Sequence, residues 1–232
     1  MPSQILGNDF GFAEKQVERN LLEIQKNIAH YKVKIIAVTK YFGLDAIKMG
    51  YKTGIRDFGE SRAFEAIEKI NQLPDEIREK STFHFIGHLQ SNKAEKVVQY
   101  FDVIHSVDTL KIAQVISKAA CSLNKREKIL LQVNNAGEAQ KFGFTKDSLK
   151  SVFKEILDLE GIEVMGLMNI APLNAEKQEL RKLFSDIREF RNELSESFNV
   201  ELPDLSMGMS NDYEIAVEEG STMIRVGRKL FK

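Results

Sequence analysis

Short apolar runs alternate with amphipathic segments along the whole chain. Eight of these runs have the length and residue types of buried strands. The expected strands are Ile35–Thr39, Arg56–Gly59, Thr82–Ile86, Val103–Val107, Ile129–Asn134, Val164–Ile170, Leu205–Met209 and Thr222–Val226. Between them apolar residues recur at steps of three or four, most clearly over Asn174–Phe198, which is typical of helices with one buried face. An extra helix is expected before the first strand, from the apolar positions Val17, Leu21, Ile24 and Ile28.

Strands that alternate with helices in this way predict an α/β protein, a single (β/α)8 TIM barrel with an extra N-terminal helix. Barrels of this kind start at about 200 residues, and the chain has 232. A doubly wound open sheet is the alternative, but it usually has a glycine-rich first turn, and Lys40-Tyr41-Phe42-Gly43 is not one. The chain has four prolines and no Gly/Ser-rich linker, so we expect residues 1–232 to form one domain.

Charge and cysteine content narrow the classes of function. The 33 Lys and Arg residues against 34 Asp and Glu residues give a net charge of −1, so no overall field favours nucleic acid or an anionic membrane. Cys121 is the only cysteine, which excludes an intrachain disulfide and favours a reducing cellular compartment. Its Ala-rich helical surroundings predict a buried thiol. No secretory signal and no apolar run near the ~18 residues of a membrane helix are visible. We expect a soluble cytoplasmic protein, a monomer or weak homodimer, without nucleic-acid or membrane partners.

The strongest signals of a binding site lie at three strand ends. Ser210 follows the seventh strand and is expected to cap a helix, whose free N–H groups and dipole would favour an anion. Gly227 ends the eighth strand and permits close approach of the backbone. Lys40 ends the first strand, which neighbours the eighth in a closed barrel, so the three residues converge at one rim. A lysine that faces a phosphate cradle is the basic geometry of a pyridoxal-phosphate site.

Other polar residues near these strand ends allow more than one interpretation. Arg225 is expected to point inward, either over the cradle or as a structural arginine that closes a barrel layer through a salt bridge. Ser61, after the second strand, either contacts a ligand or caps the next helix. His84 and His88 lack the one-turn helical spacing of paired metal ligands, so no metal site is expected. His88 or Asn92 could line the pocket.

Motifs along the chain resemble those of the pyridoxal-phosphate homeostasis protein family, also called the YggS/PROSC family. The matching segments are AVTK at 37–40, RDFGE at 56–60, HFIGHLQSNK at 84–93, HSVD at 105–108, QVN at 132–134, KFGF at 141–144, GLM at 166–168, SMGMS at 206–210 and EEGSTMIRVG at 218–227. HFIGHLQSNK together with SMGMS and RVG is highly specific. The resemblance implies a barrel similar to the N-terminal domain of alanine racemase, with pyridoxal 5′-phosphate bound as a Schiff base on Lys40.

By the same resemblance, the cofactor-binding residues are Lys40, Ser61, Met209, Ser210, Arg225, Gly227 and Arg228. Arg225 faces the pyridine nitrogen, while Ser210, Gly227 and the backbone of residue 228 hold the phosphate. Ser61 and Arg228 stand where the family usually has Asn and Thr. These departures indicate an altered pocket rather than a lost one.

The implied function is intracellular homeostasis of the cofactor, by storage, buffering or delivery to apo-forms of enzymes that use it, with no catalytic residues.

One alternative is a fold-type III enzyme, an amino-acid racemase or decarboxylase. Racemisation needs two acid/base groups on opposite faces of the cofactor. In related racemases the second is a tyrosine of a further domain, which we do not expect in a chain that ends at Lys232. An arginine at the pyridine nitrogen would also weaken the electron sink that transamination needs. The other alternative is an interaction scaffold that has lost the cofactor.

Overall fold

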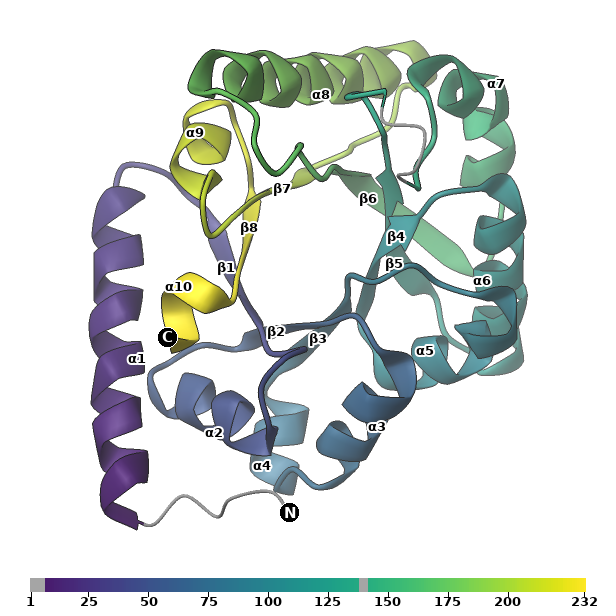
Figure 1. The fold of residues 1–232 in the computed structure, drawn as a ribbon. Helices are drawn as coiled ribbons and strands as arrows, with labels where there is room; N and C mark the ends of the chain where they lie inside the picture. Colours follow the sequence, from purple (N-terminus) through teal and green to yellow (C-terminus); the bar gives the residue numbers. More distant parts are fainter. Residues whose placement is uncertain (1–6, 138–141) are drawn as a thin grey trace.

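Eight parallel strands close into a barrel, because β1 pairs with both β2 and β8 (Figure 1). The computed structural model describes residues 7–137 and 142–232, so Lys141 of the KFGF motif lies outside the described residues. The strands are β1 Lys34–Val38, β2 Asp57–Glu60, β3 Thr82–Phe85, β4 Val103–Val107, β5 Glu127–Gln132, β6 Ile162–Met168, β7 Asp204–Met209 and β8 Met223–Val226. The predicted (β/α)8 barrel is confirmed.

Helices surround the barrel and connect each strand to the next (Figure 1). They are α1 Gly7–Asn27, α2 Leu44–Lys52, α3 Ala63–Asn71, α4 Asp75–Glu79, α5 Ala94–Tyr100, α6 Leu110–Ser122, α7 Lys146–Leu157, α8 Lys177–Phe198, α9 Tyr213–Glu218 and α10 Arg228–Phe231, with a short 3-10 helix η1 Ser91–Lys93. None of those in the described ranges combines the length and the apolar content that crossing a bilayer requires.

The extra helix α1 lies along the outside of the barrel where β8 meets β1 (Figure 1). The side-chain amide of Asn20 donates to the carbonyl oxygen of Leu230 at 3.0 Å, and that of Asn27 donates to the hydroxyl of Tyr213 at 2.8 Å. These bonds join α1 to α10 and α9, the two short helices that follow the last strands. The N-terminal helix therefore fixes the segment that the sequence predicted to hold an anion.

The strand bounds differ from the predicted ones most in the middle of the chain. β5 begins at Glu127 and β6 at Ile162, each two residues before the predicted start. Glu127 pairs with Ile162 in the ladder, because backbone pairing of parallel strands continues through a charged residue that hydropathy alone excludes from a strand. The long helix α8 begins at Lys177 rather than Asn174.

The prediction of a buried thiol at Cys121 is wrong, because this side chain is exposed. Ala119 and Ala120 in the same helix are buried, at 9% and 0% exposure. Successive residues are rotated by about 100° around a helix axis. The next position in the last turn of α6 therefore faces solvent.

Candidate functional site

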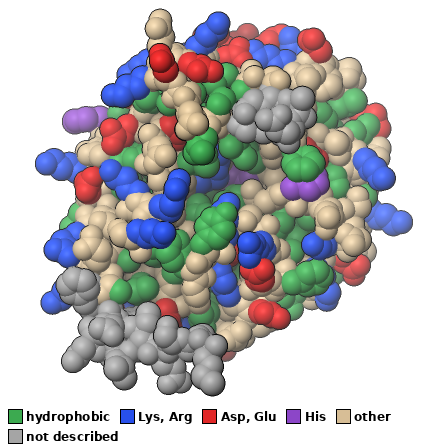
Figure 2. Space-filling view, in the orientation of Figure 1, with side chains coloured by type: hydrophobic (Ala, Val, Ile, Leu, Met, Phe, Trp, Pro, Cys, Tyr) green, Lys and Arg blue, Asp and Glu red, His purple; other side chains and the backbone are tan. Residues whose placement is uncertain are grey.

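A cavity of about 420 Å³ opens at the C-terminal ends of the strands. Figure 2 looks onto the barrel end that carries α10 and shows hydrophobic and basic side chains mixed across the middle of that face. Six of the seven residues expected around the cofactor lie in the cavity wall: Lys40, Met209, Ser210, Arg225, Gly227 and Arg228. The predicted convergence of strands one, seven and eight at one rim is confirmed.

Ser61 is the expected residue that the structure does not bring into the cavity wall. It does not cap a helix either, since Arg62 occupies the N-cap position of α3. The backbone of Ser61 instead lies against Gly87, where an added Cβ would come within 2.2 Å of the Ser61 carbonyl oxygen. The loops after β2 and β3 touch at this point, and the serine has a packing role there.

Lys40 is held in place through the residue before it. The hydroxyl of Thr39 donates to Oε1 of Glu60 at 2.8 Å, and Nζ of Lys69 donates to the carbonyl oxygen of Thr39 at 2.9 Å. Lys69 and Glu60 are themselves an ion pair at 2.7 Å, with side-chain exposures of 15% and 1%. These contacts fix the backbone of Thr39, although Oε2 of Glu60 is buried without a hydrogen-bond partner. The amine of Lys40 then extends into the cavity wall, 5.2 Å from the ring centre of Tyr41.

A β-bulge in β7 brings two of its residues to the inside of the barrel. By strict alternation Ser206 and Met209 would face opposite sides of the sheet. The register against β8 shifts between them, and Gly208 turns toward α9, where an added Cβ would lie 2.6 Å from that of Ala216. The extra residue reverses which face of the sheet each later residue of the strand points to. Ser206 therefore contacts Arg225 inside the barrel while Met209 still lines the cavity.

Arg225 is a buried cation with 5% exposure and no carboxylate in hydrogen-bond contact among the described residues. Its Nη1 donates to the carbonyl oxygen and the hydroxyl of Ser206 at 2.7 and 2.6 Å, and its Nη2 donates to the carbonyl oxygen of Asn169 at 2.8 Å. Burial lowers the pKa of Arg225 to about 10, and the charge of Asp212 opposes this shift. The side chain is therefore charged at neutral pH. The salt bridge of the structural interpretation is absent in the described part of the chain.

A guanidinium has five N–H donors, and these contacts use three of them. Nε and one N–H of Nη2 have no acceptor in the described ranges, although Arg225 lines the cavity. The Nε atom is not enclosed by protein, so its N–H group can reach a ligand in the cavity. This arrangement fits a ligand that presents a hydrogen-bond acceptor to the floor of the cavity.

The prediction that Ser210 caps the helix after β7 is wrong. α9 begins at Tyr213, and Asp212 occupies its N-cap position, where the carboxylate accepts from the amide of Met209. Burial raises the pKa of Asp212, and this backbone hydrogen bond lowers it. The hydroxyl of Ser210 instead accepts from the amide of Lys229 at 3.3 Å, at the start of α10. Ser210 thus joins the loop after β7 to the loop after β8.

Backbone amides around Ser210 remain free. The amides of Ser210, Asn211 and Arg228 have no acceptor among residues 7–137 and 142–232. All three residues line the cavity. Free N–H groups that converge with a cationic side chain are suited to an oxyanion such as phosphate. Gly227 contributes by packing, because an added Cβ would lie 2.9 Å from the carbonyl oxygen of Val38.

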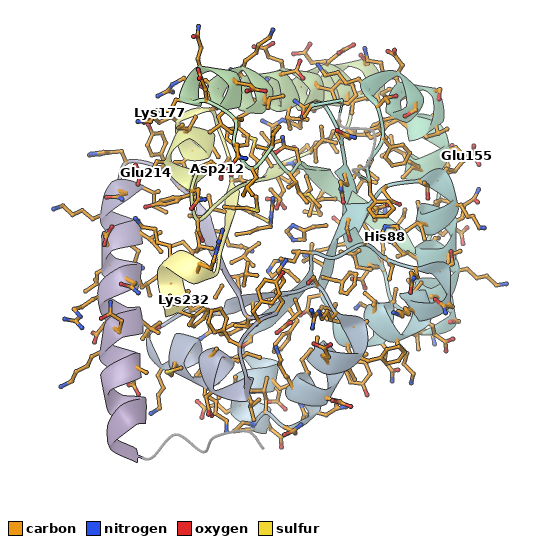
Figure 3. The ribbon with its side chains drawn as sticks, viewed as in Figure 1. His88, Glu155, Lys177, Asp212, Glu214 and Lys232 are labelled. Atoms are coloured by element: carbon orange, nitrogen blue, oxygen red, sulfur yellow. The ribbon has the colours of Figure 1, made fainter. Side chains whose placement is uncertain are left out.

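His88 does not line this cavity. Its Nδ1 lies 2.9 Å from Oδ2 of Asp108, and its ring stacks on that of Phe142 with centroids 3.6 Å apart. Figure 3 shows His88 and Asp212 on opposite sides of the barrel opening. Asn92 lies in η1 and is not part of the cavity wall either.

Sequence reasoning considered His84 only as a metal ligand, and it missed the hydrogen bonds that connect His84, His105 and Ser206 to Arg225. Ser206, His105 and His84 are each at most 1% exposed. They form hydrogen bonds with one another inside the barrel. A signal was present, because each is a polar residue in the middle of an otherwise apolar strand, and such residues are either paired or functional.

Comparison with known proteins agrees with this geometry. The alanine racemase N-terminal domain family matches residues 13–232. A pyridoxal phosphate homeostasis protein of Aquifex aeolicus is 38% identical over 198 residues, which cover 85% of this chain and 86% of the relative. One of Synechocystis is 40% identical over 199 residues, or 86% of this chain and 90% of the relative. The chain belongs to the pyridoxal phosphate homeostasis protein family.

Solved structures extend the comparison. PipY of Synechococcus elongatus PCC7942, determined with PLP bound, is 37% identical with a TM-score of 0.84, and the match covers 93% of this chain and 100% of PipY. An alanine racemase of Clostridium difficile is 19% identical with a TM-score of 0.77, and the match covers 93% of this chain and 56% of the racemase. At this identity the racemase shows the fold alone. This member of the homeostasis family has the barrel of alanine racemase.

Proposed function

We propose that this chain binds pyridoxal 5′-phosphate in the cavity at the barrel rim and serves in homeostasis of the cofactor, by storage, buffering or delivery. One observation carries the proposal. A single cavity wall combines a lysine amine, a buried arginine with unused N–H donors, and a group of free backbone amides. These three features match the aldehyde, the ring nitrogen and the phosphate of one molecule. PipY, a relative of known structure, is described with PLP bound.

Lys40 is the residue we propose for covalent attachment. The cofactor supplies an aldehyde carbon that condenses with a primary amine. The Nζ of Lys40 would hold that carbon as a Schiff base, with the carbonyl oxygen released as water. The Thr39–Glu60–Lys69 contacts fix the backbone from which the amine extends. Attachment at a fixed backbone position limits the entropy lost when the cofactor binds.

Arg225 and the two loops after β7 and β8 would hold the opposite parts of the molecule. The unused N–H donors of Arg225 face an acceptor such as an unprotonated ring nitrogen, and a guanidinium charged at neutral pH disfavours protonation of that nitrogen. The amides of Ser210, Asn211 and Arg228 donate to phosphate oxygens, and the Arg228 side chain adds a positive charge. Met209 packs beside them. Ser61 is left out of this set because it lies outside the cavity wall.

We further propose that the chain does not turn over a substrate. Besides the two arginines, the titratable side chains that residues 7–137 and 142–232 contribute to the cavity wall are Lys40, Tyr41 and Asp212. Lys40 and Tyr41 come from one loop, and the carboxylate of Asp212 is bound to the amide of Met209. Racemisation needs acid/base groups on both faces of the cofactor, and this wall supports an exchange of protons from one side. Apo-forms of enzymes that use the cofactor are the recipients we propose, and residues 1–232 act as one domain.

Reduction with borohydride tests the attachment. The wild-type protein, incubated with pyridoxal 5′-phosphate and reduced, should carry a pyridoxyl group on Lys40 that peptide mass spectrometry locates. Lys40→Ala should lose this adduct and keep its circular dichroism spectrum, because a rim residue contributes little to the core. Lys93→Ala is the matched control, since Lys93 lies at the same rim but outside the cavity wall. An adduct that persists on another lysine in Lys40→Ala would contradict the assignment.

A further inference from the structure

A chain of buried hydrogen bonds leads away from Arg225 through the inside of the barrel. The hydroxyl oxygen of Ser206 accepts from Nη1 of Arg225 at 2.6 Å and lies 2.9 Å from Nδ1 of His105. Nε2 of His105 lies 2.9 Å from Nδ1 of His84. Nε2 of His84 lies 3.0 Å from Oδ1 of Asp57. Five side chains from five strands thus form one continuous chain.

The chain connects the two ends of the barrel. Arg225 lines the cavity at the C-terminal ends of the strands. Asp57 is the first residue of β2 and lines a second cavity of about 320 Å³ at the opposite end, together with Lys34. The interior of such barrels is usually filled by layers of branched apolar side chains. The polar residues between Arg225 and Asp57 replace part of this packing with directed hydrogen bonds.

When both histidines are neutral, Asp57 fixes the direction of every bond. A guanidinium can only donate, and an ionised carboxylate can only accept. Ser206 therefore donates to Nδ1 of His105, whose Nε2 proton is donated to Nδ1 of His84, whose Nε2 proton is donated to Asp57. In this arrangement each neutral ring carries its proton on Nε2. Burial lowers the pKa of His105 well below its ordinary value, and the charges of Arg225 and Lys34 add to this.

A proton added at His84 would reverse part of the chain. With both ring nitrogens protonated, Nδ1 of His84 donates to His105, which must then accept at Nε2 and donate from Nδ1 to Ser206. The hydroxyl oxygen of Ser206 would accept from His105 and Arg225 together, and its own proton would lose its acceptor. A proton added next to Asp57 therefore changes the hydrogen bonds of the Ser206 hydroxyl that Arg225 contacts at the other end.

We propose that Ser206, His105, His84 and Asp57 are positioning residues for Arg225, and that through them Asp57 sets how firmly the guanidinium holds an acceptor in the cofactor cavity. The inference rests on the proposed function, since the acceptor there is the ring nitrogen of the cofactor. The carbonyl oxygens of Ser206 and Asn169 anchor the guanidinium independently of the chain. Removal of the chain should therefore change the environment of the ring without releasing Arg225 from the wall.

Other charged groups lie near this chain of hydrogen bonds, and their effects on Arg225 must be distinguished from the effect of Asp57. Lys34 on β1 lies 3.3 Å from Asp57, and Asp212 acts on Arg225 from the cavity side. Asp204 on β7 interacts with the charges of Lys34, His84 and Lys128, but its hydrogen bond goes to Thr222. Asp204 thus carries the same charge at the same end of the barrel as Asp57 without being part of the chain. It is the matched control.

The test follows the visible absorption of the bound cofactor between pH 5 and 9 in wild type, Asp57→Asn and Asp204→Asn. Loss of the Asp57 charge disfavours added positive charge along the hydrogen-bond chain, so the midpoint of the absorbance change should move to lower pH by about one unit. Asp204→Asn should move it much less. A midpoint unchanged in Asp57→Asn, or moved as far in Asp204→Asn, would overturn the proposal.

A double-mutant cycle shows whether the effect travels through the chain. In a Ser206→Ala background, Asp57→Asn should no longer move the midpoint, because the link to Arg225 is missing. Equal shifts in both backgrounds would mean that the charge of Asp57 acts through space, against the proposal. Cofactor affinity should fall about tenfold in Ser206→Ala, the usual effect of one lost hydrogen bond to a charged group.

Ring-nitrogen NMR of the cofactor-free protein is an independent measurement. Both His84 and His105 should show a protonated Nε2 and a bare Nδ1 at neutral pH. A proton on Nδ1 of either ring would contradict the direction of the chain. If the wild type bound no cofactor at all, the proposed function would fail, and these spectra would still decide the hydrogen-bond chain.

Discussion

Gly208 and Ala216 bring β7 and α9 into direct contact, since a Cβ added to Gly208 would lie only 2.6 Å from the Cβ of Ala216. Gly208 also has a φ of +92°, a conformation that residues with a Cβ rarely adopt. This is the residue at which β7 bulges, so the same glycine turns Ser206 toward Arg225 and Met209 toward the cavity. The packing of β7 against α9 and the geometry of the cavity wall therefore both depend on Gly208.

Gly208→Ala should therefore destabilise the protein and distort the site. The added methyl group meets both a positive φ and an occupied space, which together cost about 2–4 kcal/mol in the free energy of unfolding. Urea denaturation measures this change. Gly43→Ala is the control, because the Cβ position of Gly43 has no neighbour within 4 Å. Equal stability of the two variants would show that β7 can relax away from α9.

The bulge also marks what the sequence could not predict. All eight strands were located from apolar runs, and the order of the strands placed Lys40, Ser210 and Gly227 at one rim. Alternation assumes an unbroken strand, so it could not show that Ser206 and Met209 both face inward. The prediction that Ser210 caps the helix after β7 was wrong for a related reason. Ser210 and Asp212 are both good capping residues, and only the tertiary contact between Ser210 and Lys229 decides between them.

Ser210→Ala should weaken binding of pyridoxal 5′-phosphate through the phosphate. The variant loses a hydroxyl that joins the two phosphate-binding loops, and a loss of about 1–2 kcal/mol corresponds to an affinity about 5- to 30-fold lower. Pyridoxal lacks the phosphate, so its affinity should stay the same. Absorbance titration with both compounds measures the difference.

Ser61→Ala is the matched control for this prediction, because Ser61 was also expected at the cofactor but lies outside the cavity wall. It should bind both compounds as the wild type does. If Ser210→Ala weakened pyridoxal as much as pyridoxal 5′-phosphate, the phosphate would have to bind elsewhere. A phosphate-specific loss in Ser61→Ala would bring the loop after β2 back into the site.

Glu127 should make the cofactor-free protein less stable at high pH. Its side chain is fully buried at the start of β5, and burial raises its pKa from 4.5 to about 7, although Lys125 lies 2.6 Å away and opposes the shift. Between these two pH values the unfolded chain has released the proton and the folded chain still holds it. The unfolded state then binds fewer protons, so the free energy of unfolding falls as pH rises from 4.5 to 7.

Glu127→Gln removes this pH dependence. Relative to the wild type, the variant should gain up to about 3 kcal/mol in the free energy of unfolding between pH 4.5 and pH 8. Its absolute offset also includes the loss of the ion pair with Lys125, so the comparison is made across pH. Glu95→Gln, at an exposed position of α5, should run parallel to the wild type. Parallel curves for Glu127→Gln as well would mean that Glu127 is ionised in the folded protein.

The absence of turnover is tested most sensitively by exchange at the α-carbon of a bound amino acid. An amino acid that displaces Lys40 from the cofactor would leave the freed amine close to its α-proton, which would allow slow exchange on one face. A proton donor on the other face is needed for inversion, and the cavity wall offers Tyr41 from the same loop and an Asp212 that is already hydrogen-bonded. We therefore expect negligible racemisation, decarboxylation or transamination of common L-amino acids, together with measurable transfer of the cofactor to an apo-enzyme.

Incubation in deuterium oxide, followed by mass spectrometry of the amino acid, detects abstraction of the proton even without inversion. Incorporation should remain orders of magnitude below the ~10 turnovers per second of a typical enzyme. Tyr41→Phe should leave any residual exchange unchanged, whereas Lys40→Ala should abolish it, because only the freed amine is placed to take the proton. Exchange at an enzyme-like rate that both residues support would reinstate the fold-type III enzyme, since two groups would then act on the α-carbon.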